Sequence, residues 1–431
     1  MVHRKALLKV IVALVFVTFS SQINAQQNET LRLSLEQAQQ LAIERNRTLD
    51  NAELDVQIAQ ATKWQSISSL LPQVSASADY SNMFGYMMSF GEMKIALPSS
   101  ATMAVTAAVT FNGAQVVGIA LSEISRQMSD ISLKKTAQTI ANQVKTLYYS
   151  ALVSKQTIDL LKSSLAEVEK LHNISQQSVD AGASEQVSAD QMLVQVSTTK
   201  TTISGAERSL EMIYNALRLQ LNLSPDSEIV LTDELDALID TDLSMALLNE
   251  QFNIDNNYDY QLLKKNVDMA KKQLSMTQWS IAPTIRIAYQ YSAKKTFGEG
   301  MNMTPPNTMN IGVSVPLFTS LQTAKKIKSA KLSYQKSMNS LADTENSLQV
   351  QYRQYCYDLK SAYEKYLNHE KNLEVNKRVF ANMAAKYQQG YSSVLEMTNA
   401  NTTLIGAQSS YVQSILELIN AEIELNTLLN K

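Results

Sequence analysis

Few residues in this sequence have the types and the spacing that catalysis or metal binding requires. Cys356 is the only cysteine, and beyond the first 25 residues the histidines are His172 and His369, which are far apart. Zinc and copper sites need several His, Cys or carboxylate side chains held around one point. We therefore predict no metal site, and a single cysteine excludes a disulfide within the chain.

The sequence also lacks the residue sets of common enzymes. We find no arrangement of Ser, His and Asp, no phosphate-binding glycine loop and no cofactor motif. Four methionines gather in one loop, at Met83, Met87, Met88 and Met93. Thioethers bind soft metals, but an adaptable apolar loop tip explains these residues more simply. We predict that the chain is not an enzyme and holds no cofactor.

The first 25 residues have the pattern of a secretory signal peptide. Arg4, Lys5 and Lys9 precede an apolar stretch over 10–19, and Ala25 ends a cleavage site. This segment holds three of the 38 basic residues and none of the 40 acidic ones, so the mature chain carries a net charge of −5. A chain without a basic patch is not suited to nucleic acid. No later segment has about twenty consecutive apolar residues, which leaves a soluble exported protein or a β-barrel.

The sequence contains two related halves. The segment 69–74 resembles 280–285, Phe111 corresponds to Phe318, and Gly182 corresponds to Gly390, all at offsets of 207 to 211 residues. Landmarks in one order at nearly one offset indicate a duplication. The predicted parts are a signal peptide over 1–25, a first repeat over 26–225, a linker or equatorial segment over 226–250 and a second repeat over 251–431.

Each repeat is predicted to contain a helix, a β-hairpin and a long helix pair. The first helix starts at Ser34 in a capping box with Gln37 and continues to Ile67. The hairpins span 73–113 and 284–318, where apolar and polar residues alternate. Two hairpins cannot close a barrel, so we expect their free strand edges to pair with copies of the same chain.

The long helices carry heptad patterns. From Leu133 to Val168, and again from Met397 to Leu428, apolar or small residues recur at steps of four and three. Gly182 and Gly390 fall where each helix pair must reverse, which requires positive φ. A second apolar stripe, for example Val412, Ile415, Ile419 and Ile423, gives these helices two adhesive edges. An ordinary antiparallel coiled coil is one interpretation, and a sheet or cylinder of helices is the other.

At these residues the chain resembles the TolC-type outer-membrane efflux proteins over nearly all of its mature length. The matching pieces are Leu33–Ala38 with Ala42 and Asn46, Pro72 with Gln73, Val313–Phe318, and Lys386–Gly390 leading to Ala400. Each piece is short, and their order together with the duplication makes the combination specific.

The resemblance implies an α+β membrane protein. It would be a homotrimer with a shared 12-stranded outer-membrane β-barrel, four strands from each chain, continued by a periplasmic α-helical barrel. It would be the exit duct of a tripartite efflux or type I secretion system in a Gram-negative outer membrane. Its partners would be further copies of itself, outer-membrane lipid, a periplasmic adaptor protein and an inner-membrane RND or ABC pump.

In this family the tips of the helix pairs close the channel at its periplasmic end. The gate residues that the resemblance implies here are Gly182, Ser188, Gln191, Tyr387, Gly390, Ser392, Glu396 and Asn399. Tyr387 corresponds to a gate tyrosine and Glu396 to an acid that faces the pore. Ser392 stands where the type member has an arginine, and Asn399 where it has a second acid, so fewer salt links should hold this gate closed. Glu396 as a plain solvated acid is the competing interpretation.

Two other kinds of protein were weighed against a duct. A periplasmic coiled-coil scaffold or adhesin without a barrel would explain the heptads but not the four alternating segments with Gly and Pro loops. An exported enzyme has no residue set to support it.

Overall fold

The computed structural model describes residues 30–431 except 92, 97, 236–244 and 299–303, so the predicted signal peptide lies outside it. The chain forms two compact units, which are described separately below. The sheet unit comprises residues 45–143, 240–372 and 413–431, and the helix-tip unit comprises residues up to 44, 144–239 and 373–412. Within the described residues, no helix has an apolar stretch long enough to cross a membrane.

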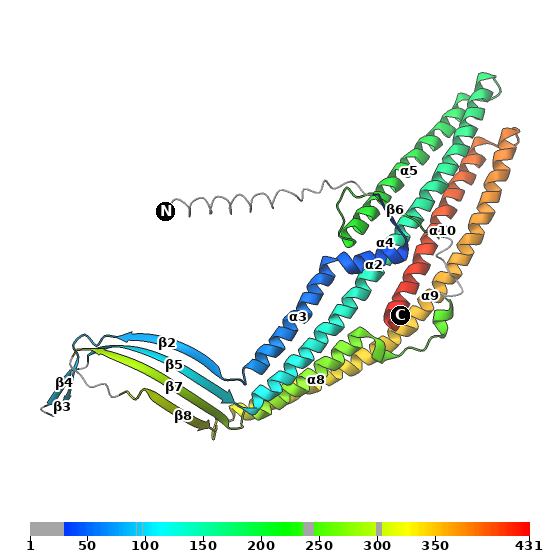
Figure 1. Ribbon diagram of the computed structural model, residues 1–431. Coiled ribbons are helices and arrows are strands. Elements are labelled where there is room, and N and C mark those ends of the chain that lie inside the picture. Colours follow the sequence, from blue (N-terminus) through cyan, green and yellow to red (C-terminus); the bar gives the residue numbers. More distant parts are fainter. Residues whose placement is uncertain (1–29, 92, 97, 236–244, 299–303) are drawn as a thin grey trace, which may run out of the picture. The chain divides into compact units, whose positions relative to one another are not determined.

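A four-stranded antiparallel sheet is the centre of the sheet unit (Figure 1). Its strands are β2 (Gln73–Ser81), β5 (Ser99–Phe111), β7 (Thr284–Phe297) and β8 (Asn307–Ser314), in that spatial order. The predicted hairpins are confirmed as strand pairs, and the β5–β7 contact joins them, with Phe111 opposite Ile285. The sheet is open among the described residues, since β2 and β8 each have one edge without a partner strand.

The predicted loop between the first two strands contains additional structure. Within the loop predicted over 83–100, β3 (Met87–Phe90) and β4 (Met93–Ala96) pair as a short antiparallel hairpin. Phe84 and Gly85 precede it with φ of 47° and 75°. Glycine is the residue that best tolerates this left-handed backbone. The sequence did not predict this small hairpin, because strands of four residues give little periodic signal.

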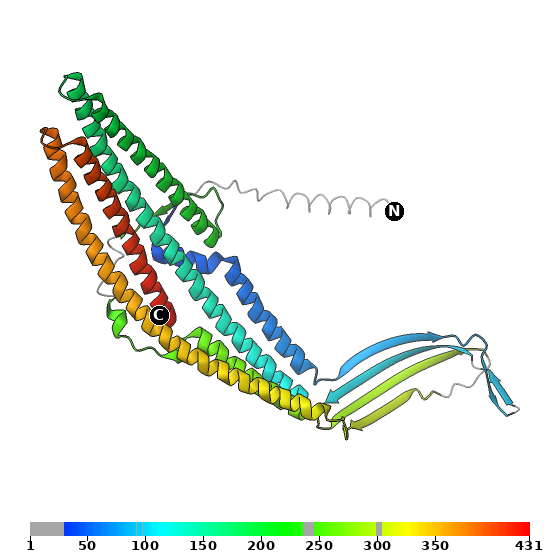
Figure 2. The same ribbon diagram turned by 180° about the vertical axis from the view of Figure 1, so that it is seen from behind.

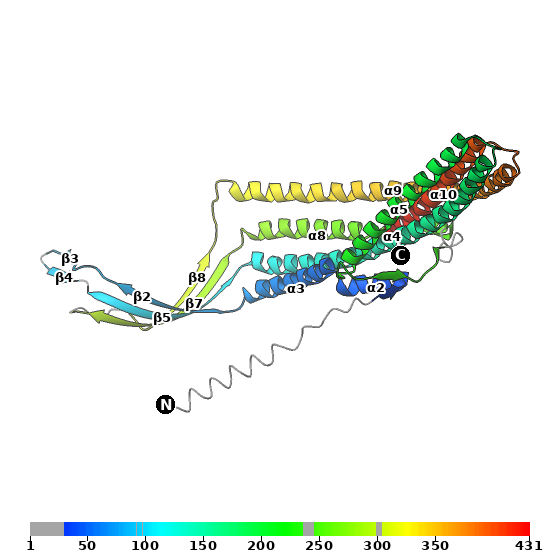
Figure 3. The ribbon, with the colours of Figure 1, turned by 90° about the horizontal axis from the view of Figure 1, so that it is seen from above.

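Helices of the sheet unit lie side by side, and a short stretch of chain connects each of them to one strand of the sheet (Figure 3). The helices of this unit are α3 (Arg47–Ser68), α8 (Tyr258–Trp279) and parts of α4 (Gly113–Asp180), α9 (Gln322–Gln388) and α10 (Val394–Leu429). Ser66 of α3 hydrogen-bonds Ser122 of α4 at 2.7 Å, and Lys135 of α4 forms an ion pair with Asp259 of α8. The order α3, α4, α8, α9 therefore follows the strand order β2, β5, β7, β8.

Both apolar stripes of α10 are buried, as the two-edged pattern predicted. Ile415 and Ile419 of the second stripe are 0% and 5% exposed. On one side Thr427 accepts a hydrogen bond from Asn142 of α4 at 2.7 Å. On the other side Glu417 pairs with Lys365 of α9 at 3.0 Å. The helix is thus packed on two sides within one chain.

The prediction of a single helix from Ser34 to Ile67 is wrong. The structure has α2 (Leu35–Arg45) and α3, separated at Asn46. The backbone of Asn46 is extended (φ −74°, ψ 119°) and its side-chain oxygen accepts from Thr48 N at 2.9 Å, which makes it the N-cap of α3. The capping box at the start of α2 is confirmed, with Ser34 N donating to Gln37 Oε1 at 3.0 Å.

A glycine at the start of α4 makes room for a tryptophan. Trp279, the last residue of α8, packs against Gly113, so a Cβ added at Gly113 would lie 2.1 Å from Trp279 Cε3. Such a distance requires the ring or the helix to move. Close packing therefore requires a glycine at position 113, where the helices join the sheet.

Replacing Gly113 by alanine should lower the melting temperature, although alanine favours a helix over glycine by about 1 kcal/mol. Gly118→Ala in the same helix is the matched control, because an added Cβ there meets nothing within 4 Å. Thermal unfolding of the two variants in detergent micelles separates steric from helix-propensity effects. We expect a lower melting temperature for Gly113→Ala and an unchanged or higher one for Gly118→Ala; a rise in both would contradict the contact.

The helix-tip unit contains two helix hairpins, α4–α5 and α9–α10 (Figure 2). Its other elements are α2, α5 (Gln186–Gln220), β1 (Leu31–Leu33) and β6 (Ile229–Leu231). A buried cluster joins all four long helices and includes Leu171, Met192, Phe380 and Met397. Both predicted reversals are confirmed, with φ of 75° at Gly182 and 77° at Gly390.

Part of the segment predicted as a linker over 226–250 is a strand. Ile229–Leu231 of β6 pair in parallel with Leu31–Leu33 of β1. Asp233, just beyond β6, accepts from Leu35 N at 2.8 Å and so caps α2 from 198 residues away. The hydroxyl of Tyr148 on α4 donates to Leu33 O at 2.9 Å and lies 3.0 Å from Asp233 Oδ2. Burial raises the pKa of this hydroxyl, and Asp233 adds to the shift.

Candidate functional site

The sheet has one apolar face. The pairing of the four strands places apolar residues from each strand on the same side. Val105 on β5 lies opposite Ala76 on β2 and Tyr291 on β7, and their side chains point to the same side. The large members of this face are Val74, Tyr80, Met103, Val105, Phe111, Ile285, Ile287, Tyr289, Tyr291, Met309, Ile311 and Val313. They are 39% to 70% exposed in the single chain. A continuous exposed apolar surface of this size marks contact with lipid or with another protein.

The opposite face of the sheet is polar and built from small side chains. Thr106, the residue after Val105, lies opposite Ser75 and Gln290. The face continues through Ser77, Thr102, Thr110, Ser292, Asn310 and Ser314. A strand set with alternating apolar and polar sides fits lipid on one side and water on the other.

Aromatic and apolar side chains surround the end of the sheet where the helices join. The two tryptophans of the chain, Trp64 and Trp279, lie near the ends of α3 and α8 and are 61% and 50% exposed. Leu317 and Phe318, which follow β8, are also exposed. Tryptophan concentrates at membrane–water boundaries, because its ring is apolar and its N–H is polar. This end of the sheet therefore has the composition of a membrane interface.

The tips of the two helix hairpins share one turn geometry. Ala183 N donates to Ser178 O at 2.8 Å after Gly182, and Tyr391 N donates to Lys386 O at 2.9 Å after Gly390. This five-residue-back hydrogen bond defines a Schellman motif, in which the left-handed residue is usually glycine. The duplication predicted from the sequence is therefore visible in the backbone of both turns.

Glu396, the expected gate acid, is bound to the start of its own helix. Its carboxylate accepts from Ser393 N at 2.9 Å and from the hydroxyls of Ser392 and Ser393 at 3.0 and 3.1 Å. In return Ser393 Oγ accepts from Glu396 N at 3.2 Å, so the two residues form a capping box. The backbone N–H of Ser393, followed by the two hydroxyls, holds the pKa of Glu396 below its usual range.

The first hairpin lacks this arrangement. Glu185 precedes α5 in the position of Ser393 and makes no side-chain capping hydrogen bond. Ser188 is half-buried and Gln191 is exposed, as is Asn399 in the second half. Tyr387 packs against the buried cluster of the helix-tip unit and is partly covered. The structure thus brings Ser392 and Glu396 together, and it places Tyr387 on the apolar side of the turn.

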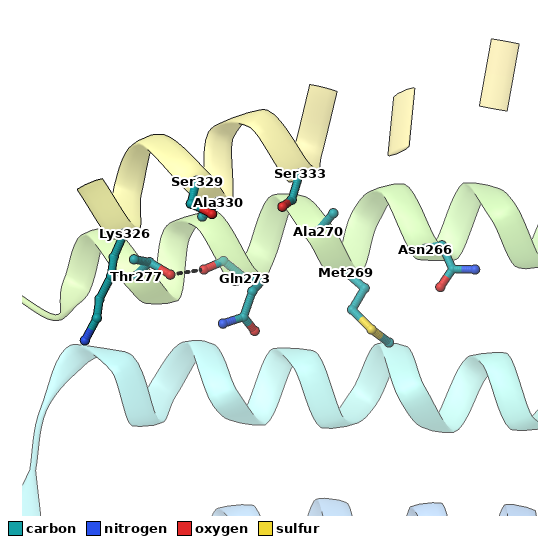
Figure 4. Close-up of a pocket in the computed structure, with 9 residues that line it drawn as sticks. All are labelled: Asn266, Met269, Ala270, Gln273, Thr277, Lys326, Ser329, Ala330 and Ser333. Atoms are coloured by element: carbon teal, nitrogen blue, oxygen red, sulfur yellow. Dashed lines mark hydrogen bonds between the residues drawn. The ribbon is translucent and has the colours of Figure 1, made fainter. Parts of the chain in front are cut away.

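A groove in the sheet unit lies between α8 and α9 (Figure 4). Its volume is about 510 Å³, and its lining residues are Asn266, Met269, Ala270, Gln273, Thr277, Lys326, Ser329, Ala330 and Ser333. The Thr277 hydroxyl donates a hydrogen bond to Gln273 O at 2.9 Å. The residues that line the groove include no histidine and no carboxylate beside the serines. Among the described residues no group of three or more His, Cys, Asp or Glu is placed to hold a metal.

A sheet with one lipid-suited and one water-suited side, continued by helices as long as α4, defines a channel-type membrane protein with a helical extension. The chain belongs to the outer membrane efflux protein family, whose sequence pattern matches residues 38–223 and 253–431. The family places the protein in the outer membrane of a Gram-negative bacterium, with a periplasmic extension.

The sequence is similar to those of known proteins over most of its length. Toxin and drug export protein A of Aggregatibacter actinomycetemcomitans is 24% identical over 303 residues, which cover 67% of this chain and 63% of that protein. The outer membrane protein TolC of Escherichia coli strain K12 is 22% identical over 452 residues, 98% of this chain and 87% of TolC. The solved structure of CusC has a TM-score of 0.76 at 16% identity, covering 94% of this chain and 95% of that chain. The chain therefore has the fold of TolC-like channels and is an outer-membrane efflux protein.

Proposed function

We propose that three copies of this chain form the exit duct of a tripartite efflux or type I secretion system. The observation that carries the proposal is the open, two-faced sheet: its apolar face is exposed, and among the described residues β2 and β8 each have one edge without a partner strand. Strand edges inside a bilayer must be paired, because no water is present to satisfy them. Pairing β8 of one copy with β2 of the next removes both edges and gives a shared barrel of twelve strands.

The outer helices of the sheet unit support the same assembly. Leu54 and Ile58 of α3 are 52% and 61% exposed, and Leu332 and Val350 of α9 are 55% and 66% exposed. These helices continue the two edge strands, so their apolar residues fall where neighbouring copies would meet. The matched family segments also agree with two repeats flanking 226–250, a division that we retain as a proposal.

The helix tips suit contact with a partner protein. Val187 of α5 and Leu395 of α10 occupy equivalent positions of the two hairpins, 208 residues apart, and are 59% and 66% exposed. We assign these tips to a periplasmic adaptor protein, which would connect the duct to an inner-membrane RND or ABC pump.

Gel migration and fractionation test the proposal together. A barrel shared by three chains should run as a trimer without heating, run as a monomer after heating, and partition with the outer membrane. A protein found only in the soluble periplasmic fraction would instead support the coiled-coil scaffold and would end the duct proposal.

The proposed gate carries its own prediction. Glu396→Gln should reduce the cation selectivity of the channel, because three carboxylates at the entrance would no longer attract cations. Glutamine can still form the capping box, so the helix start is preserved. Single-channel recording measures the effect, with Ser393→Ala as the control that removes the cap but keeps the charge. Unchanged cation selectivity and cation block in Glu396→Gln would count against a gate ring.

A further inference from the structure

The polar face of the sheet has an uneven distribution of charge. Its charged residues among those described are Asp79, Arg286 and Lys294. Asp79 and Lys294 both lie opposite Thr102, one on each side of it, so opposite charges occur at one level of the sheet. Arg286 lies eight residues before Lys294 on the same strand, about 27 Å away at the usual rise per residue. It is the isolated charge of this face.

The surroundings of Arg286 leave its guanidinium free. Its register partners are Thr110 on β5 and Gly312 on β8, and a Cβ built on Gly312 meets nothing within 4 Å. Arg286 is exposed and has no hydrogen-bond or ion-pair partner among the described residues. Arginine stays charged at any physiological pH. An unpaired cation therefore stands on the water-suited side of the sheet.

The first acid of α4 after the sheet is not free to offset this charge. Glu123, on the third turn of α4, is bound by Arg126 at 2.9 Å and by Lys63 at 2.8 Å. Arg126, then Lys63, hold the pKa of Glu123 well below its usual range. The carboxylate is thus already neutralised by its own neighbours and adds no free negative charge at this end of the sheet.

We propose that Arg286 determines ion specificity in the strand-lined part of the duct, as a ring of three guanidinium groups that favours anionic solutes. The inference rests on the proposed trimer, in which the polar face lines the lumen and Arg286 repeats at one level. The ring lies at the helix end of the sheet, since Arg286 is the third residue of β7. Solutes with carboxylate, sulfonate or phosphate groups are the class that it would favour.

The net charge of the polar face is opposite in sign to the net charge of the chain as a whole. The mature chain carries a net charge of −5, whereas the charged residues of the polar face sum to +1 per chain, from two basic residues and one acid. Average acidity would make the whole lumen favour cations. The register instead predicts that the barrel section favours anions.

The test is the reversal potential of purified channels in planar bilayers under a KCl gradient near 0.1 M. For an ion about 10 Å from three charges, screened at a Debye length of about 10 Å, removing the ring should change the permeability of each ion about twofold, upward for K⁺ and downward for Cl⁻. Arg286→Gln should therefore raise the K⁺ to Cl⁻ permeability ratio about fourfold, and Arg286→Glu by about the square of that factor. In 1 M KCl, where the Debye length is about 3 Å, the difference should disappear.

Lys295→Gln is the matched control, because Lys295 is on the same strand, carries the same charge and points to the apolar face opposite Ala101. It should leave the permeability ratio unchanged. The proposed ring is contradicted if the K⁺ to Cl⁻ permeability ratio is unchanged in Arg286→Gln, or if it changes equally in Lys295→Gln. A wild-type chain that forms no conducting pore overturns the duct itself and is recognised before any variant is compared.

A second measurement keeps the proposal testable if Arg286→Gln fails to assemble. In a Cys356→Ser background, Arg286→Cys should react with charged, membrane-impermeant thiol reagents, and Ile287→Cys should not. The two residues are adjacent, with Arg286 on the polar face and Ile287 on the apolar face. Failure of Arg286→Cys to react would place the residue away from water and overturn the inference.

Discussion

Lysine at position 105 should prevent the protein from accumulating in the outer membrane, whereas lysine at position 106 should be tolerated. Val105 is at the centre of β5, on the apolar face, opposite Ala76 and Tyr291. A lysine facing lipid near the bilayer midplane costs about 2–4 kcal/mol in each chain. In a trimer the cost occurs three times, which is comparable to the whole stability of a typical domain.

Thr106 provides a control of nearly the same size and shape at the next position. It lies on the polar face between Ser75 and Gln290. A lysine there meets water and polar groups, so the cost of Thr106→Lys should be small. The two variants differ only in which side of the sheet receives the charge.

The measurement is the amount of heat-modifiable protein in the outer-membrane fraction for Val105→Lys, Thr106→Lys and wild type. Strong loss for the first variant and near-normal amounts for the second are expected. Equal amounts of both would show that the exposed apolar face is not in contact with lipid.

Removal of the Asp233 carboxylate should strongly destabilise the helix-tip unit. The carboxylate caps α2 through Leu35 N at 2.8 Å and receives the hydroxyl of Tyr148, a fully buried residue, at 3.0 Å. Loss of a helix cap and of a charged hydrogen bond to a buried group together cost about 2–4 kcal/mol. We therefore expect Asp233→Ala to lower the unfolding free energy by about this amount.

Two further variants test whether the carboxylate itself is the cause of this loss. Asp233→Asn keeps an oxygen acceptor for Leu35 N, so its unfolding free energy should fall less than that of Asp233→Ala. Glu234→Ala removes the adjacent exposed acid and should have almost no effect. Thermal or urea unfolding in detergent compares them, and a loss for Glu234→Ala that matches Asp233→Ala would contradict the proposed role of the cap.

The same contact predicts a pH dependence. An unfolded tyrosine ionises near pH 10, and burial raises the pKa of Tyr148 above that in the folded protein. The stabilisation from the neutral hydroxyl is therefore complete below pH 10 and falls as the pH rises above it. The stability difference between wild type and Tyr148→Phe should shrink above pH 10, and a difference that is constant to higher pH would contradict the shift.

Local patterns in the sequence predicted the elements because local chemistry determines them. Alternation from Gln73 and from Thr284 predicted the strands, heptads predicted α4 and α10, and Gly182 and Gly390 predicted the reversals. Two local signals were present but not used. Asn46 is a good N-cap that divides the first helix, and Ser393 with Glu396 has the spacing of a capping box. The second signal explains why the expected gate acid is bound to its own helix.

Only the tertiary structure decided what depends on residues far apart in the sequence. A slip of one residue in the β5–β7 register would put Val105 on the same face of the sheet as Arg286 instead of on the opposite face. Neither strand alone contains that register. The cap on α2 comes from Asp233 and the space over Gly113 is filled by Trp279, each more than 160 residues away. The sequence by itself determined a duplicated chain of strands and long helices, and the pairing of those strands determined which side of the sheet is apolar and where its isolated charge lies.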